Sequence, residues 1–175
     1  MDSVWIRPAF SMWPQYNARL RDVVSELTVE QLALPAIGHA PRPTAERWPI
    51  WATVGHTACQ RVFWLCDFLG EPGAETTRFT TAAFDCPGDD DLENALNADE
   101  LVDALDSTFR IVQNSLDAWT VDMLTEEIRR PDFGPDWVHT RGSVLQRVFS
   151  HDVYHCGELS QTLGAAGLRQ IDLWD

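Results

Sequence analysis

Basic residues are scarce in this sequence. Lysine and arginine together number 13 against 27 aspartate and glutamate residues, which gives a formal net charge of −14. A chain this acidic repels the phosphates of nucleic acids and the headgroups of anionic membranes, and its basic residues form no stripe along the sequence. We therefore expect no nucleic-acid or membrane partner and interpret the acidity as a contribution to solubility.

Long apolar runs and paired-cysteine motifs are also missing. No stretch reaches the roughly 20 apolar residues of a membrane-spanning helix, since residues 56–69 are interrupted by Gln60, Arg61 and Asp67. The start of the chain lacks the apolar segment of a signal peptide. None of the four cysteines belongs to a Cys-x-x-Cys motif, and we expect reduced thiols in a cytoplasmic protein.

No internal repeat or low-complexity segment divides the chain, and its 175 residues fit one domain, 1–175. A domain of this size buries roughly 70% of the surface that its unfolded chain exposes, so a core can form without disulfides or a structural metal. Residues 70–95 have the composition of a long loop, with two Pro-Gly pairs and consecutive aspartates at 89–91. A connection of this length is unusual inside a compact domain and is often functional.

Several segments are predicted to be helical. In the first, the apolar residues between 20 and 27 have the i, i+3, i+4, i+7 spacing of one buried face. The second is apolar on more than one face and should be largely buried. Capping motifs are predicted at Thr28–Gln31, before a short extra turn, and at Asn97–Glu100. No segment shows the alternation of a β-strand, although residues 129–141 can hold a short extended piece, so the predicted fold is all-α. The predicted helices span residues 11–27, 48–69, 97–119 and 142–163.

Two histidines share the core face of the last predicted helix. His151 and His155 follow Val144 and Val148 on one apolar stripe, where leucines are expected. Residues four apart lie about 40° apart around a helix and one turn along it, so the two imidazoles can reach a common ion. The alternative is a pair of core histidines bonded to polar neighbours, because an unsatisfied buried imidazole is costly.

His56 supplies a third candidate ligand. It lies near the start of the second predicted helix, in the middle of its apolar surface, and the helices of a bundle can present side chains to one interior site. The sequence therefore predicts a divalent-metal site formed by His56, His151 and His155, with a metal-free helical bundle as the alternative. His39 and His139 lie in loop-like sequence and are expected to be exposed or locally hydrogen-bonded.

Glu158 shares the face of the histidine pair, since it lies three residues after His155. It is a candidate catalytic residue with three roles open: a fourth ligand, a partner to a ring N–H, or a base. A carboxylate in solvent is the alternative. Asp152 follows His151 where the zincin protease motif requires glutamate, so that motif is not matched.

Other side chains near these residues are expected to be structural. Cys59 lies one turn from the histidine of the second helix, so a metal ligand is one interpretation of it. A buried, inert thiol is the expected alternative there and at Cys156. Trp51, Trp64 and Tyr154 can line a pocket, but aromatic residues at helical spacing more often belong to the core.

Taken together, these residues resemble the DinB/YfiT-like superfamily. Trp48-Pro49-Ile50 followed by His56 is similar to the family's tryptophan at the start of helix two and the histidine within that helix. The run His151-x-x-x-His155-Cys156-Gly157-Glu158 is similar to its signature on helix four. The order and spacing agree over residues 13–167, and residues 171–174 resemble the family's C-terminal tail.

The resemblance implies an up-down-down-up four-helix bundle with a long crossover between helices two and three, in place of a simple up-down bundle. It also implies metal ligation by His56, His151 and His155 and, often, a homodimer. Characterised relatives are S-transferases that use low-molecular-weight thiols such as mycothiol or bacillithiol, and a mycothiol-dependent maleylpyruvate isomerase. The isomerase type has a His, Glu, His ligand set, from which this chain departs at His151.

Three neutral imidazoles leave a divalent ion with a net positive charge and at least one open position, as in catalytic zinc sites. We therefore expect a metal-dependent S-transferase in which a small-molecule thiol attacks an electrophile, with Glu158 as a proton acceptor. A metal-dependent hydrolase and a non-catalytic, metal-binding stress or scaffold protein are the alternatives. Zinc is the default for imidazole donors, while nickel, iron, manganese and cobalt accept the same ligands.

Overall fold

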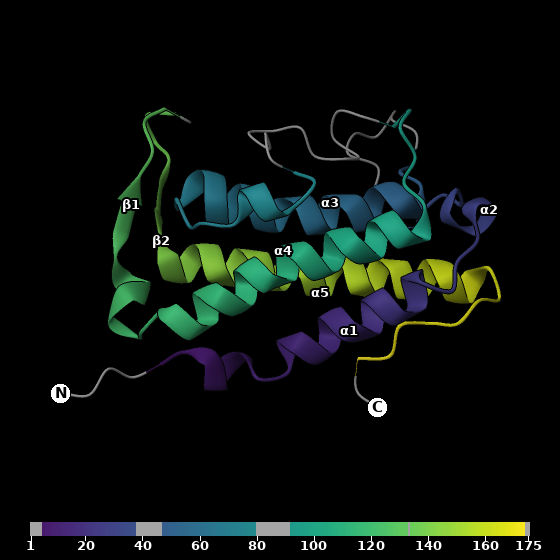
Figure 1. Ribbon diagram of the computed structural model, residues 1–175, viewed down its shortest axis with the longest axis horizontal. Coiled ribbons are helices and arrows are strands. Elements are labelled where there is room, and N and C mark those ends of the chain that lie inside the picture. The colour runs from purple at the N-terminus through teal and green to yellow at the C-terminus, as the bar shows by residue number, and fades with distance from the viewer. Residues whose placement is uncertain (1–4, 38–46, 80–91, 133, 174–175) are drawn as a thin grey trace.

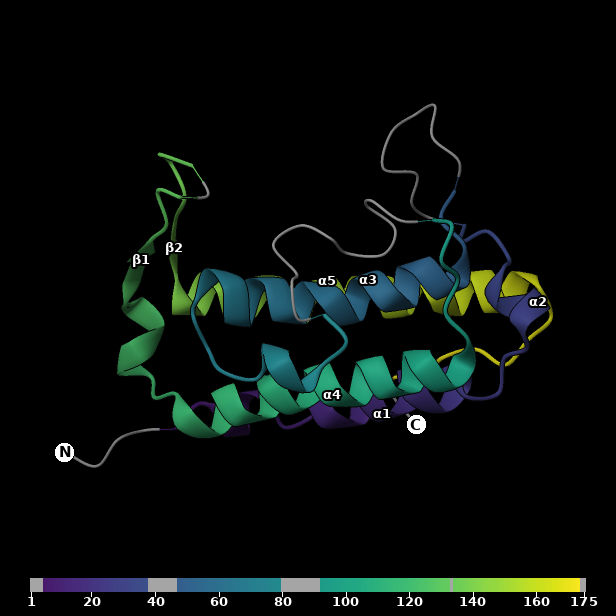
Figure 2. The same cartoon turned by 45° about the horizontal axis from the view of Figure 1, so that its top comes forward.

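The chain is mostly helical, and its long helices lie side by side along the long axis of the molecule (Figure 1). The computed structural model describes residues 5–37, 47–79, 92–132 and 134–173. The turned view in Figure 2 shows α3 and α5 in one layer and α1 and α4 in the other. The long helices are α1 (Trp13–Val24), α3 (Ile50–Val62), α4 (Ala98–Ala118) and α5 (Arg141–Ala165).

One apolar core runs between these helices. Helix α4 packs against α1 and α3, and α5 packs against α3 and α1, so each long helix contacts two others. The mostly apolar face of each helix is thereby removed from water, which supplies the main stabilisation of such a bundle. Fully buried members of the core include Trp13, Leu20, Ile50, Val54, Leu105, Leu116 and Val144.

Capping boxes begin the helices where the sequence predicts them. The Thr28 hydroxyl accepts a hydrogen bond from the Gln31 N–H, and the Gln31 side chain accepts one from the Thr28 N–H, before the single turn of α2 (Val29–Leu32). Asn97 and Glu100 make the same reciprocal pair at the start of α4. Both predictions are confirmed. These bonds stabilise the helix starts because they satisfy N–H groups that have no partner inside a helix.

The second predicted helix changes geometry along its length. It begins at Ile50 rather than Trp48, because Pro49 is extended at the N-cap, and α3 then continues into the π-helix η2 (Phe63–Phe68). The prediction that this segment is largely buried is confirmed. The wider turn of a π-helix was not predicted, and such turns are often found near functional sites.

A short β-hairpin is added to the mostly helical fold that the sequence predicts, and its second strand lies within the expected extended piece at residues 129–141. Strand β1 (Glu127–Arg129) pairs antiparallel with β2 (Val138–Thr140), with Ile128 opposite His139. Strands of three residues are too short to show a convincing alternating pattern in the sequence. The hairpin leads directly into α5, since β2 ends at Thr140 and Thr140 is also the N-cap of the helix. The Thr140 side chain accepts the capping hydrogen bond from the Ser143 N–H.

The remaining elements are short. The 3-10 turns are η1 (Arg7–Phe10), η3 (Ala74–Thr76) and η4 (Asp122–Thr125). Turn η3 lies within the predicted 70–95 loop, whereas the aspartates at 89–91 lie outside the described residues. Among the described residues, no helix has both the length and the apolar character needed to cross a membrane.

Candidate metal centre

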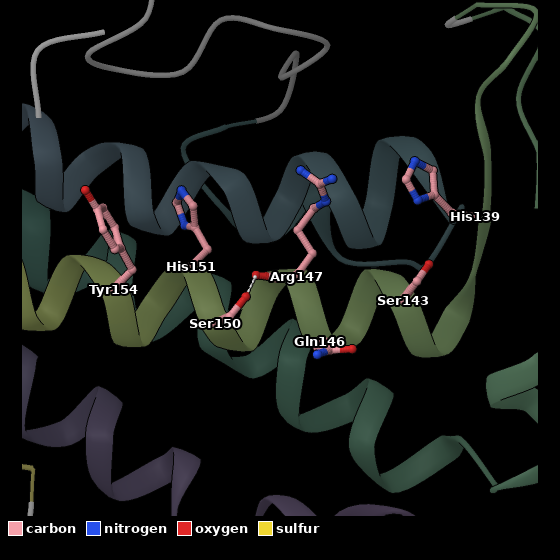
Figure 3. Close-up of a pocket in the computed structure, with 7 residues that line it drawn as sticks. All are labelled: His139, Ser143, Gln146, Arg147, Ser150, His151 and Tyr154. Atoms are coloured by element: carbon pink, nitrogen blue, oxygen red, sulfur yellow. Dashed lines mark hydrogen bonds between the residues drawn. The ribbon is translucent and has the colours of Figure 1, made fainter.

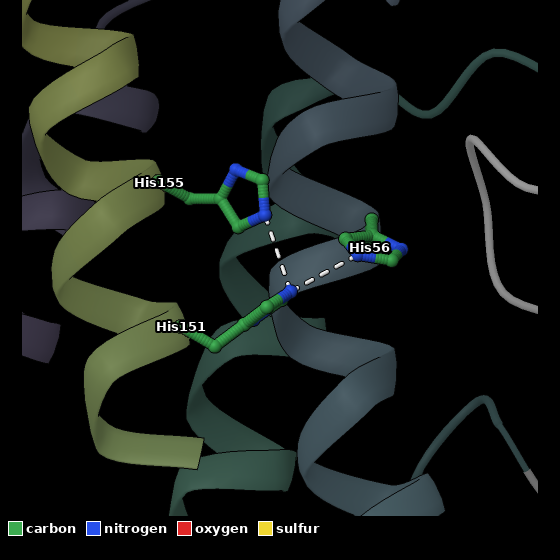
Figure 4. A group of neighbouring side chains, drawn as sticks. All are labelled: His56, His151 and His155. Carbon is green, nitrogen blue, oxygen red and sulfur yellow. Dashed lines mark hydrogen bonds between the residues drawn. The ribbon is translucent and has the colours of Figure 1, made fainter. Parts of the chain in front are cut away.

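The structure brings the three predicted ligands together between α3 and α5 (Figure 4). Nε2 of His151 lies 3.1 Å from Nε2 of His56 and 3.2 Å from Nε2 of His155. The candidate ligand atoms of all three residues lie within 4.8 Å of one another. Side chains from two helices thus present three nitrogen donors to one point.

The packing of the two helices explains this convergence. His151 and His155 are one turn apart on α5, and the neighbouring helix α3 carries His56 opposite them. The buried indole of Trp48 contacts the His56 ring edge-on, at 4.9 Å between ring centres. The tryptophan that precedes α3 therefore restricts the orientation of the first candidate ligand.

Glu158 is placed behind the third candidate ligand. Its Oε2 atom lies 2.8 Å from Nδ1 of His155, and both side chains are buried. A carboxylate only accepts hydrogen bonds, so Nδ1 of His155 carries the proton and a neutral ring has its lone pair on Nε2. Of the roles that the sequence left open for Glu158, this geometry matches the partner to a ring N–H.

The surroundings of His151 favour its neutral form. Burial, followed by the neighbouring His155 and His56 rings and the guanidinium groups of Arg61 and Arg147, lowers the pKa of His151 to about 2. A neutral imidazole is the form that ligates metals. Three converging nitrogens, one of them fixed as a lone-pair donor by a buried carboxylate, fit a divalent cation of the zinc, nickel or cobalt type.

One side of the cluster opens onto a groove with a volume of about 710 Å³ (Figure 3). His151 lines this groove, whereas His56 and His155 are only 8% and 3% exposed. A small molecule in the groove can therefore approach the cluster from the His151 side. The residues that line the groove are His139, Ser143, Gln146, Arg147, Ser150, His151 and Tyr154.

Asp152 has a structural environment that the sequence did not reveal. Its carboxylate accepts hydrogen bonds from the Arg61 guanidinium, the shortest at 2.9 Å, and from the Trp13 indole at 2.8 Å. Arg61 is 1% exposed, and its Nη1 also donates to the Leu105 carbonyl oxygen. This buried network ties α3, α5, α1 and α4 together, so Asp152 is not placed as the base of a protease motif.

Two predictions about cysteine and histidine need correction. Cys59 is disulfide-bonded rather than reduced, a pairing that depends on tertiary distances no sequence pattern records. His139 is half-buried on β2, against the rings of Trp64 and Phe68, because the hairpin places it next to η2. Cys156 is a buried free thiol, as predicted.

The remaining predictions concern the aromatic residues and the other loop histidine. Trp51 is buried in the core, Tyr154 is exposed beside the groove, and Trp64 lies beneath Arg147. His39 lies outside the described residues.

Comparisons with known proteins find a matching family model and similar solved structures. The family model of the DinB superfamily matches residues 15–159. The crystal structure of a DinB-like protein from Bacillus cereus is similar over 98% of each chain, with a TM-score of 0.66 and 17% identity. That of a conserved protein from Enterococcus faecalis is similar over 92% of this chain and 96% of its own, with a TM-score of 0.60 and 16% identity. No curated protein matches the chain significantly.

Proposed function

Since this chain belongs to the DinB superfamily, we propose that His56, His151 and His155 bind one divalent metal ion and that the protein is a metal-dependent S-transferase. The observation that carries the proposal is the convergence of three Nε2 atoms beside a groove.

The order of the long helices is part of the proposal. In Figure 1 the chain runs one way along α1 and α5 and the other way along α3 and α4, which supports an up-down-down-up bundle with its crossover before α4.

Zinc is the first choice of metal, and nickel, iron, manganese and cobalt can use the same three donors. When bound, such an ion lowers the pKa of a thiol or water that reaches its open position. The reaction forms a bond between the thiol sulfur and an electrophilic carbon. The thiol loses its proton, and the leaving group departs with the electron pair of the broken bond.

The residues around the site have separate tasks in this proposal. Glu158 is a positioning residue that holds the His155 ring with its lone pair toward the cluster, and its use as a proton acceptor stays a prediction. His151 faces the groove, so substrates approach past it. His56 and His155 are buried, so water and substrates reach the cluster from the groove.

Two alternatives and two further expectations stay predictions. A metal-dependent hydrolase would use the same donors with water in place of the thiol, and a metal-binding stress or scaffold protein would need no substrate. No contact in the described residues favours either over the transferase. The homodimer and the cytoplasmic location also stay predictions.

The proposal is tested by offering the metal-loaded protein a panel of thiols with a chlorinated aromatic electrophile. Cysteine, glutathione, bacillithiol and mycothiol make a suitable panel, and mass spectrometry detects the thioether product. We expect product from at least one thiol, lost after chelation and in His56→Ala. Hydrolysis of the electrophile without thioether would favour the hydrolase, and no turnover with a fully loaded site would contradict both enzyme proposals.

A further inference from the structure

The groove beside the candidate metal centre has an unusual charge for this chain. The protein carries 27 acidic residues, yet none of the described residues that line the groove is acidic. Arg147 is the one permanently charged residue among them. The local charge of the groove is therefore opposite in sign to the net charge of the protein.

Arg147 differs from most arginines in the structure because no acidic side chain pairs with it in the described part of the chain. All 13 basic residues are arginines. Most of the described ones form ion pairs with carboxylates, as Arg61 does with Asp152 and Arg141 with Glu71. An arginine left without a carboxylate in so acidic a chain keeps its hydrogen-bonding edge available for an anion from solution.

Aromatic packing holds this guanidinium in place. Its central carbon lies 4.6 Å from the centre of the Trp64 ring, and Trp64 in turn stacks on Trp137, at 5.8 Å between ring centres. Stacking on an aromatic face leaves the N–H groups at the edge of the guanidinium able to donate. The Arg147 side chain is therefore already restricted in the free protein, so it loses less conformational entropy when an anion binds.

The position of Arg147 relative to the candidate ligands is set by α5. It precedes His151 by one helical turn, about 6 Å along the axis. Figure 3 shows Arg147, His151 and Tyr154 projecting from the same side of α5, with His139 at the far end of the row. A molecule of a few bonds can thus reach Arg147 and the His151 side of the cluster at the same time.

We propose that Arg147 is the specificity-determining residue of this groove and selects substrates that carry a carboxylate a few bonds from the reacting atom. The carboxylate accepts hydrogen bonds from the guanidinium while the reacting end points toward His151. This assignment rests on the proposed function. The carboxylate can belong to the thiol or to the electrophile, and the experiment separates these two sources.

The test compares acids with their neutral amides of the same shape. In the thiol arm, 3-mercaptopropionate and 3-mercaptopropionamide are titrated into cobalt-loaded protein, and the near-ultraviolet thiolate-to-cobalt absorption reports binding. In the electrophile arm, chloroacetate and chloroacetamide, which carry chloride as the leaving group, are titrated into zinc-loaded protein. The Nε–H signal of Arg147 in ¹H–¹⁵N spectra, assigned with Arg147→Gln, reports both arms.

We expect the acid of at least one pair to bind about tenfold more tightly than its amide, as a charge-assisted hydrogen bond predicts. The preference should vanish in Arg147→Gln, be partly kept in Arg147→Lys and be unchanged in Arg110→Gln. Arg110 is a matched control, because it is exposed on α4 and lies outside this groove. Metal content should be equal in all of these variants.

Different results separate the two proposals. Equal binding of acid and amide in both arms, or a preference that survives in Arg147→Gln, would overturn the role of Arg147 and leave the proposed function standing. If neither thiol produces the cobalt absorption, the thiol-transfer proposal fails. In that case a response of the Arg147 signal to the acids alone would still support the anion site, and no response would overturn it.

Discussion

Nδ1 of His155 donates a hydrogen bond to Oε2 of Glu158 across 2.8 Å, within one turn of α5. This contact fixes the tautomer of a candidate metal ligand from behind, on the side away from the other two histidines. The candidate centre is therefore a cluster of three rings in which at least one lone pair is held in place by a buried carboxylate.

Removal of this carboxylate should weaken metal binding without abolishing it. We expect Glu158→Ala to lower metal affinity by about 10- to 100-fold, and Glu158→Gln to lower it less because its amide oxygen still accepts from Nδ1. Competition with a chromogenic chelator measures the affinity. Glu26→Ala removes an exposed carboxylate and serves as the control. Equal affinity in Glu158→Ala and the parent would contradict the positioning role.

Loss of the buried ion pair between Arg61 and Asp152 should lower the free energy of unfolding more than loss of an exposed ion pair. We expect Asp152→Ala to lower the free energy of unfolding by about 3–5 kcal/mol, because it leaves a buried guanidinium without its partner. Arg169→Ala breaks an exposed pair with Glu26 and should cost about 0–1 kcal/mol. Urea unfolding measures both, and similar losses in the two variants would contradict this account.

Metal removal should leave the bundle folded. The core between α1, α3, α4 and α5 is continuous without any contribution from an ion. We expect a chelator to lower the melting temperature by roughly 5–10 °C while the helical circular dichroism at 25 °C is retained. Complete loss of helical signal on chelation would instead indicate a structural metal.

The free thiols Cys66 and Cys156 should be inert in the native protein. Burial, as the largest cause, raises the pKa of each thiol to about 12. At pH 8, four units below that value, only about one thiol in ten thousand is in the reactive thiolate form. We expect no alkylation by iodoacetamide in native buffer and modification of both residues in urea, as counted by mass spectrometry. Rapid native alkylation of either residue would show that its surroundings are open.

Much of the helical architecture can be predicted from the sequence because it depends on local patterns. The capping boxes at Thr28 and Asn97 act over three residues, and the apolar stripes repeat at helical spacing. The histidine cluster can also be predicted, since His151 and His155 lie one turn apart on the stripe that the sequence predicts to face the core. A polar ring in such a position needs an explanation, and a shared ion supplies one.

Features that depend on distant partners could not be predicted in this way. Asp152 gives no sign in the sequence that Arg61, 91 positions away, is its partner. The disulfide of Cys59 depends on tertiary contacts in the same way. The hairpin that carries His139 is local, but its strands of three residues are too short to show an alternating pattern. Nothing in the sequence distinguishes Arg147 from the other arginines, and its stacking on Trp64 beside the candidate centre appears only when η2 and α5 are packed.

The most direct test of the central claim is the metal content of untagged protein, measured by inductively coupled plasma mass spectrometry. We expect about one divalent ion per chain in the parent and in the control His139→Ala, and little or none in His56→Ala and His151→Ala, with all four folded by circular dichroism. No metal in the parent after incubation with zinc, nickel or manganese, or equal metal in the triad variants, would contradict the account.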